Sequence, residues 1–311
     1  MLNVHRMSLL REVASRGSIA AAAEALYLTP SAVSQQLSTL EREAGVELLE
    51  RVGRGVRLTH TGTKLVAYTE RVLAVLEEAE ADLQAVSEGV AGQLRTCAFP
   101  TAARALLVPA LKRMRADHPL LALSMVDLEP EDSLPMLKTG DLDVVLTYGF
   151  DRLPERPDPG IERHLLLTEP LYIAVPDTDP RATGPAKLSD FRDDNWVVGR
   201  DGSPFLDVMI RVAAEAGFEP RVELHSNDYQ VLLSAVQAGL GIALVPPLAF
   251  FAQYPGVVCL RTSDVQINRR VLAVIRRGSG GRPAVEAALG VLRDVSREAV
   301  ARYETLVPLA G

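Results

Sequence analysis

Residues 17–37 read Gly17-Ser-Ile-Ala-Ala-Ala-Ala-Glu-Ala-Leu, then Tyr27, then Leu28-Thr-Pro-Ser-Ala-Val-Ser-Gln-Gln-Leu. Ser18 and Thr29 are good N-caps, and Pro30 falls at a first helical position, where a missing N–H costs nothing. The pattern predicts two short helices, about 18–26 and 29–44, with a tight turn between them. Residues 47–58 then predict strand, glycine turn and strand, because glycine permits the backbone of a hairpin tip. This layout is typical of a winged helix-turn-helix.

The helix predicted at about 29–44 is amphipathic. Its apolar side chains point one way, and the opposite face carries Ser31, Ser34, Gln35, Ser38 and Arg42. An ordinary solvated surface is the alternative, but short side chains with few charges fit a DNA groove better. Arg54 stands between two glycines at the hairpin tip, where a phosphate or minor-groove contact is its natural use.

Regular helices are also expected on either side of this stretch. The first, about 4–15, ends before Gly17. The second runs from Thr59 to about Glu88, on the order of 40 Å, and its apolar residues repeat every 3.5 positions, as in a coiled coil. Packing on its own domain is the alternative, but a seam of this length favours pairing with a second copy through Leu65, Val72, Leu76, Ala79, Leu83 and Val86.

From residue 93 the chain alternates strands and helices. The first half has strands at 94–99, 121–128 and 142–147 and helices at 103–117 and 132–139. The second half has strands at 172–175, 196–199, 221–225 and 242–245 and helices at 204–216 and 228–238. A strand at 270–275 and a helix at 283–303 are expected to return to the first half. We expect two α/β lobes, each with a parallel-rich sheet, and a ligand cleft between them.

The composition is that of a globular protein, with 311 residues, 48% apolar, and a net charge of −7. An acidic total argues against nucleic acid, yet residues 1–60 carry seven Arg against six Glu, so the acidic excess lies elsewhere. Cys97 and Cys259 lack metal spacing and fit buried, reduced thiols. The beginning of the chain shows no secretory pattern, and no apolar run approaches a membrane span. We predict a cytoplasmic protein without membrane, metal or cofactor.

The chain resembles the LysR-type transcriptional regulators. The resemblance is carried by Gly17-Ser18, Ala22-Ala23, Leu26, Pro30 to Ser34, Gln36-Leu37, Leu40-Glu41, Gly45, Leu48 to Arg51, Leu58-Thr59 and Gly62, and more loosely by Gly140-Asp-Leu-Asp and by Ala238 to Pro246. It implies a winged helix-turn-helix at 1–59, a dimerising linker helix at 60–89 and a type 2 periplasmic-binding-protein-like effector domain at 90–311. Lobe I would span 90–166 and 268–311, and lobe II 167–267.

The resemblance also implies a homotetramer, usually a dimer of dimers, that controls transcription with RNA polymerase in response to a metabolite. It places DNA contacts at Thr29, Pro30, Ser31, Ser34, Gln35, Gln36, Ser38, Arg51 and Arg54. Effector contacts would come from Pro100, Thr101, Ala102, Arg200, Ser203, Pro204, Ser226 and Asn227. Many members have Arg where this chain has Gln35, and because glutamine favours adenine, the base read there is expected to differ.

Two other classes of function fit the sequence less well. An enzyme on a bilobal fold is disfavoured, because the sequence shows no nucleophile elbow, metal cluster or paired catalytic carboxylates, and its five His are scattered. A solute-binding module of a transporter is disfavoured by the DNA-reading segment and the missing secretory pattern. The effector stays open between an amino acid, an aromatic acid and an apolar compound, and activation or repression stays open too.

Overall fold

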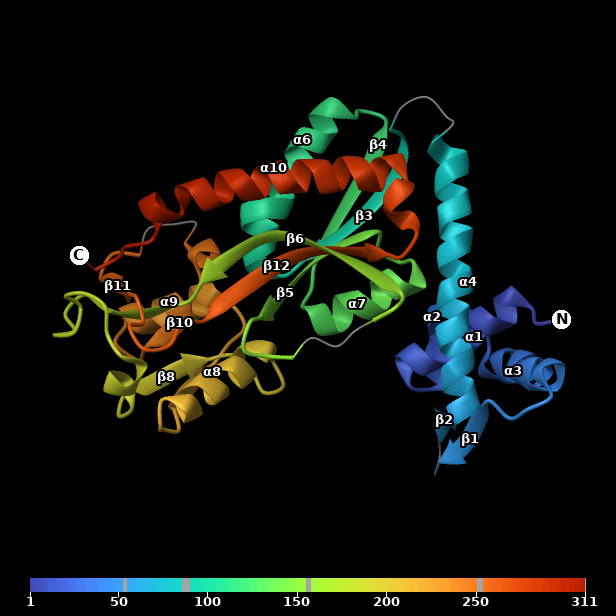
Figure 1. Cartoon of the computed structure of the whole chain (residues 1–311), viewed down its shortest axis with the longest axis horizontal. Helices are drawn as coiled ribbons and strands as arrows, with labels where there is room; N and C mark the ends of the chain where they lie inside the picture. Colours follow the sequence, from blue (N-terminus) through green and yellow to red (C-terminus); the bar gives the residue numbers. More distant parts are fainter. Residues whose placement is uncertain (53–54, 86–89, 155–157, 251–253, 311) are drawn as a thin grey trace.

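The computed structural model describes residues 1–52, 55–85, 90–154, 158–250 and 254–310. Figure 1 shows a small N-terminal head, a long helix beside it, and a two-lobed effector domain. The head contains α1 (Val4–Arg16), α2 (Ile19–Ala25), α3 (Pro30–Ala44), β1 (Leu49–Val52) and β2 (Gly55–Leu58), and the long helix is α4 (His60–Ala85). The predicted winged helix-turn-helix is confirmed.

Local sequence signals set the limits of the helices in the head. The side chains of Asn3, Ser18 and Thr29 accept backbone N–H groups at the starts of α1, α2 and α3, and Gly17 and Gly45 end α1 and α3 in the left-handed conformation. The helices then bury one apolar core, made by Met7, Leu9, Leu10, Val13, Ala22, Ala23, Val33, Leu37, Leu40 and Leu48.

The wing is tied to the recognition helix by one carboxylate. Oε1 of Glu41 in α3 accepts the backbone N–H groups of Leu48 at 2.9 Å and Leu49 at 3.1 Å. Gly62 in α4 lies so close behind the wing that a Cβ there would come within 2.1 Å of the Leu48 carbonyl oxygen. The wing tip, with Arg54, lies outside the described residues.

Lobe I has a five-stranded sheet in the order β4-β3-β5-β12-β6. Strands β3 (Gly92–Ala98), β4 (Leu121–Asp127) and β5 (Val144–Phe150) are parallel, whereas β12 (Asn268–Arg276) and β6 (Ile161–Pro170) run antiparallel to their neighbours. Side chains of α5 (Pro100–Ala102), the π-helix η1 (Ala103–Leu107), α6 (Val108–Asp117) and α10 (Pro283–Leu306) pack on one face, and those of α7 (Pro130–Thr139) on the other.

Two expectations for lobe I need correction. The sequence reading did not include β6, whose ten residues form the edge of the sheet. The return of 268–311 to lobe I holds for β12 and α10, but the end of the chain crosses to lobe II, where Leu309 forms a bridge with Cys259.

Lobe II departs from the expected parallel sheet. Strand β7 (Tyr172–Pro176) pairs antiparallel with both β10 (Ala243–Val245) and β11 (Val257–Leu260), and only β8 (Asn195–Val198) with β9 (Arg221–His225) is a parallel pair of named strands. Helices α8 (Pro204–Glu215) and α9 (Tyr229–Gln237) cover these strands. A short 3-10 turn, η2 (Leu188–Phe191), connects β7 to β8, and another, η3 (Pro247–Ala249), lies between β10 and β11. The parallel prediction was wrong because buried apolar runs do not encode strand direction.

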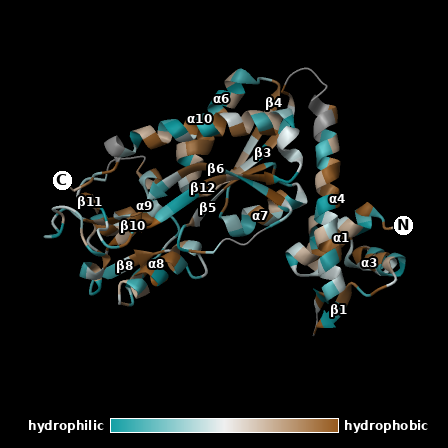
Figure 2. Ribbon diagram, viewed as in Figure 1, coloured by the Kyte–Doolittle hydropathy of each residue, from teal (hydrophilic) through white to brown (hydrophobic). Residues whose placement is uncertain are grey.

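Helix α4 touches its own chain on one side and leaves apolar side chains uncovered on the other. Leu65, expected in the seam, packs against the head core, and Thr69 one turn later is fully buried and donates to the Leu65 carbonyl. The exposed large apolar side chains among the described residues of α4 are Tyr68, Val72, Val75, Leu76 and Leu83. Figure 2 shows hydrophobic and hydrophilic residues interspersed along this helix. Val86 lies outside the described residues.

Candidate functional site

The recognition helix α3 presents a polar face to solvent. Ser31, Ser34, Gln35 and Ser38 are exposed along it, while Val33, Leu37 and Leu40 are buried on the opposite side. Thr29 caps the helix through the Ala32 N–H and also lies 3.0 Å from the Ser31 hydroxyl. Four predicted contact residues therefore lie on one open face that begins at a helix N-terminus, and Pro30 at that end is also exposed.

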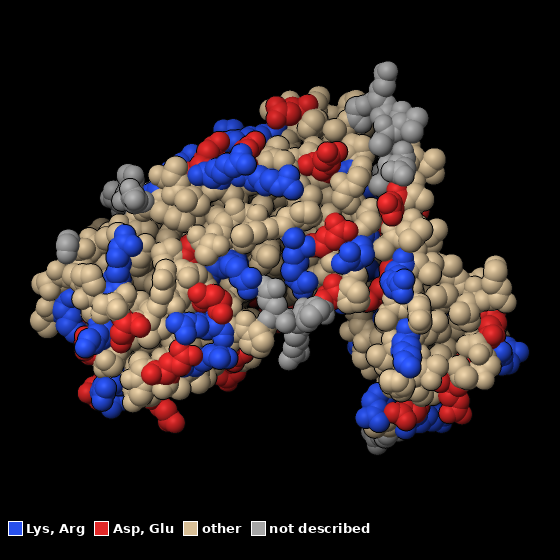
Figure 3. All heavy atoms as spheres, in the orientation of Figure 1, with Lys and Arg blue, Asp and Glu red and all other residues tan. Residues whose placement is uncertain are grey.

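Gln36 and Arg51, two other predicted DNA contacts, differ in how exposed their side chains are. Gln36 is half-buried, and its Oε1 accepts from Arg6 Nε at 2.9 Å, so it ties α3 to α1 within the head. Arg51 is exposed on β1. Val56 lies across the wing from Arg51, and Arg57 lies opposite Glu50 and forms an ion pair with it at 2.7 Å. Figure 3 shows basic and acidic side chains mixed at this end of the head.

Between the two lobes, a fully buried ion pair joins β12 to β6. Arg269 donates from Nε and Nη2 to Oε1 of Glu169, at 2.9 and 2.7 Å, and from Nη2 to the Thr101 hydroxyl at 3.2 Å. The other Glu169 oxygen accepts the Leu248 N–H at 2.9 Å. Burial acts to lower the pKa of Arg269, but the Glu169 carboxylate outweighs it and the pKa is raised, so the guanidinium keeps its charge.

Aromatic rings surround this guanidinium. Its central carbon lies 5.2 to 5.8 Å from the ring centres of Phe99, Tyr148 and Tyr229, within cation–π range. The Tyr148 hydroxyl donates to Glu129 at 3.1 Å, and burial raises the pKa of that carboxyl. These groups line a cavity of about 10 Å³, the space of about one water. The lining residues come from both lobes, so little free space is left between the lobes at this point.

The predicted effector residues fall into two groups. Pro100, Thr101 and Asn227 line this cavity. The other five do not line it. Ser203 caps α8, the Ser226 hydroxyl accepts the Asp228 N–H, and Ala102 is buried. Arg200 is exposed and donates its backbone N–H to Asn227, and Pro204 lines a neighbouring groove of about 480 Å³.

The sequence reading missed the residues that dominate the cleft. They are Arg269, Glu169, Glu129, Tyr148 and Tyr229. A signal was present for the first two, because each is a charged residue beside an apolar strand run, where an unpaired charge would be costly. The pairing partner lies 100 positions away, so no local pattern joins them.

The described ranges show no metal cluster, no membrane-spanning helix and no disulfide. No three His, Cys, Asp or Glu side chains gather there in a way that could hold a metal ion. No helix in that part of the chain is both long and apolar enough to cross a membrane. Cys97 and Cys259 are free and buried in different lobes, and burial raises the pKa of Cys97 to about 11.

Comparison with known proteins settles the family. Residues 4–63 match the bacterial regulatory helix-turn-helix proteins of the lysR family, and residues 87–297 match the LysR substrate binding domain. The chain belongs to the LysR family. This LysR-type transcriptional regulator therefore combines a DNA-binding head with an effector-binding domain.

Relatives of this LysR-type regulator cover most of its length. It is 28% identical over 246 residues to the HTH-type transcriptional regulator ClcR of Pseudomonas putida, across 78% of this chain and 82% of that protein. A cysteine mutant of Corynebacterium glutamicum OxyR matches at 25% identity with a TM-score of 0.61, over 98% of this chain and 95% of that one. CbnR, described as a LysR family transcriptional regulator, matches at 25% identity with a TM-score of 0.54, over 94% and 100%.

Proposed function

We propose that this regulator binds a paired, roughly symmetric DNA site, with α3 of each of two copies in a major groove. The observation that carries this proposal is the face of α3, which exposes Ser31, Ser34, Gln35 and Ser38 beside a fully buried apolar face. Thr29 and Pro30 lie where the helix would enter the groove, and Arg51 and Arg54 would contact the backbone or minor groove from the wing.

Gln35 is the residue proposed to read a base. It is exposed in the middle of α3, and a glutamine amide pairs best with adenine. Gln35→Ala is expected to relax the preference at one position of each half-site, by about 1–3 kcal/mol. The matched control is Gln266→Ala, which removes an exposed glutamine from the effector domain.

The experiment is selection from a random DNA library with the full chain and each variant. The parent protein should recover two half-sites, and Gln35→Ala should lose one base preference in both. Arg54→Ala should weaken binding to all sequences alike and reduce the salt slope by about 1. If both variants select and bind DNA like the parent, the assignment of the reading face is wrong.

The exposed row on α4 supports self-association. Val72, Val75, Leu76 and Leu83 are 37% to 75% exposed, and apolar side chains in a row on a helix are usually covered by a partner. A second copy of α4 is the proposed partner, with Ala79 between them, and two such dimers would form a tetramer. Pairing of two heads is what requires two half-sites in the DNA.

The cleft is the proposed effector site, lined by Thr101, Pro100 and Asn227 from the predicted set. A small metabolite bound there would change how the lobes close and thereby the spacing of the heads at a promoter, where RNA polymerase is the expected partner in the cytoplasm. A metabolite screen by thermal shift tests this, because a ligand that prefers the folded state raises its stability. Turnover of a bound compound would instead favour an enzyme.

A further inference from the structure

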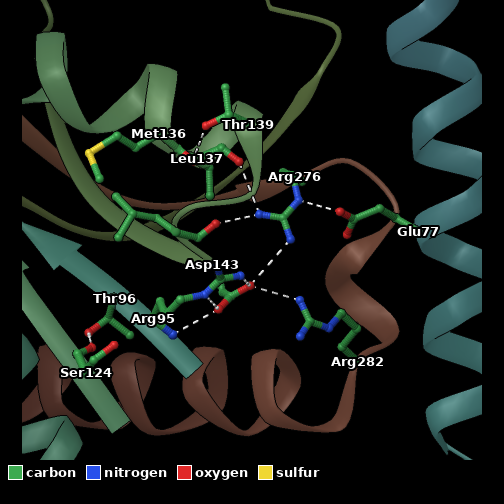
Figure 4. Close-up of polar contacts among 11 residues, drawn as sticks. Glu77, Arg95, Thr96, Ser124, Met136, Leu137, Thr139, Asp143, Arg276 and Arg282 are labelled. Atoms are coloured by element: carbon green, nitrogen blue, oxygen red, sulfur yellow. Dashed lines mark hydrogen bonds and ion pairs between the residues drawn. The ribbon is translucent and has the colours of Figure 1, made fainter. Parts of the chain in front are cut away.

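At the end of lobe I nearest to α4, one buried carboxylate accepts hydrogen bonds from three arginines. Asp143, the second aspartate of the Gly140-Asp-Leu-Asp segment just before β5, has a fully buried side chain. It accepts from Arg95 Nε at 3.1 Å, from Arg282 Nη1 at 3.0 Å and from Arg276 Nη2 at 3.4 Å. Figure 4 shows the three guanidinium groups converging on it. One negative charge therefore faces three positive ones.

Arg276 carries this cluster outward to the linker helix. Its Nη1 donates to the carbonyl oxygens of Leu137, at 3.1 Å, and Leu142, so lobe I holds the guanidinium in one orientation. Its Nε donates to Oε1 of Glu77, which belongs to α4 (Figure 4). Glu77 thus offsets part of the positive excess from outside the effector domain.

A second contact lies one turn earlier on α4. Gly278 follows β12 with a φ of +88°, and a Cβ there would come within 2.1 Å of the Ala74 carbonyl oxygen. The two backbones therefore touch without a side chain between them. Farther along the same interface, Arg16 of the head lies 3.7 Å from Asp141. The linker helix is held against lobe I by fitted contacts.

The strand that ends at this contact begins in the cleft. Arg269 at the start of β12 is the buried cleft arginine, and Arg276 at its end holds Glu77. The two are seven residues apart, or about 23 Å along a strand. Strand β12 pairs with β5 without interruption from Arg269 to Ile275, and with β6 on its other side with one register shift between Val271 and Leu272, so its two neighbours limit how far it can bend.

We propose that the Glu77–Arg276 contact clamps the linker helix to lobe I, and that β12 transmits the state of the cleft to this clamp. Glu77 acts as a positioning residue, because it lies on α4 outside both the cleft and the face of α3 proposed to bind DNA. The clamp stands on its own contacts, whereas the coupling to the cleft rests on the proposed effector site. A change at Thr101 would shift Arg269, then strand β12, and through Arg276 the position of α4.

The test measures the distance between the head and lobe I by double electron–electron resonance between two spin labels. The labels sit on Glu24→Cys and Asp117→Cys, both exposed, and the native cysteines stay unlabelled because they are buried. The full chain is diluted with unlabelled copies so that distances within one chain dominate. The variants are Glu77→Gln, the matched control Glu78→Gln, Thr101→Ala and the double Glu77→Gln/Thr101→Ala, each checked for folding by circular dichroism.

The clamp predicts that Glu77→Gln adds a second, broader distance population and lowers the docked-to-undocked ratio roughly tenfold, while Glu78→Gln matches the parent. The coupling predicts that Thr101→Ala shifts the distribution in the parent background but not in Glu77→Gln. An unchanged distribution in Glu77→Gln overturns the clamp. No shift with Thr101→Ala, or the same shift in both backgrounds, overturns the coupling. Because neither DNA nor ligand is present, these outcomes are separate from failure of the proposed function.

Discussion

Replacing Glu169 with leucine should expose how much the closed cleft depends on one ion pair. The carboxylate is 0% exposed, and it is held by two hydrogen bonds from Arg269 and one from the Leu248 N–H. Leucine has a similar size but no acceptor. The substitution therefore leaves a guanidinium that is 1% exposed and keeps its hydrogen bond to the Thr101 hydroxyl.

The cost follows from these contacts. Breaking a buried ion pair from one side costs about 3–5 kcal/mol, because a buried charge is left uncompensated. The Leu248 N–H loses its acceptor, which adds about 1–3 kcal/mol. The faces of Phe99, Tyr148 and Tyr229 remain around the cation and offset part of this loss. We expect a net loss of about 4 kcal/mol, a large share of the 5–15 kcal/mol typical of folded domains.

The assay is urea denaturation followed by tryptophan fluorescence. Trp196, the single tryptophan of the chain, is fully buried in lobe II and donates its indole N–H to the Phe191 carbonyl at 3.1 Å. The free energy of unfolding comes from linear extrapolation. Thr168→Leu, an exposed position on the same strand as Glu169, is the control and should change stability little.

A double variant separates the effect of the uncompensated charge from the effect of packing. Glu169→Leu/Arg269→Met removes both charges, so it should recover most of the stability lost in Glu169→Leu alone. A loss below about 1 kcal/mol in the single variant would show that the pair is not a buried charge pair in solution. A double variant as unstable as the single one would show that packing, not the stranded charge, causes the loss.

Three further predictions concern the head, the linker and lobe I. Leu40→Ala should destabilise the head by about 2–5 kcal/mol, which would abolish DNA binding in a mobility-shift assay while the unfolding of the effector domain stays unchanged. Val72→Asp should weaken self-association in sedimentation experiments, since it places a charge in the exposed row of α4. Burial acts to raise the pKa of Asp143, but hydrogen bonds from Arg95 and Arg282 outweigh it and lower the pKa. The stabilisation is therefore fully present above about pH 4, the usual pKa of an unfolded aspartate, and is lost progressively as the pH falls from there through the lowered pKa of Asp143. Asp143→Asn should therefore cost most stability at pH 7 and progressively less as the pH is lowered below about 4.

The head could be predicted almost completely because its signals are local. Ser18, Thr29 and Pro30 start helices, and Gly17 and Gly45 end them, each within a few residues of the feature that it controls. The apolar spacing of α3 then separates its buried face from its open one. The same locality explains why the exposed polar face of α3 could be predicted residue by residue, while its contacts with DNA stay a prediction.

The effector domain was predicted in outline and misread in detail. Apolar runs located most of the strands, but the direction of β7 depends on which strand lies beside it, and that is a long-range choice. The edge strand β6 was missed because Glu162 to His164 interrupt its apolar residues and Leu165 to Leu167 do not alternate with polar ones, so no period of two is visible. In α4, a 3.5-residue period was visible, yet Leu65 and Thr69 turned out to face the head.

By itself, the sequence determined the reading head, the linker helix and the order of the two lobes, since caps, glycines and apolar periods act over a few residues. The tertiary structure decided which charges meet. Glu169 finds Arg269, and Glu77 finds Arg276, across 100 and 199 positions of chain. A buried charge requires a partner, but only the folded backbone brings that partner within hydrogen-bond distance. For that reason the cleft pair and the clamp on α4 could be found only in the folded molecule.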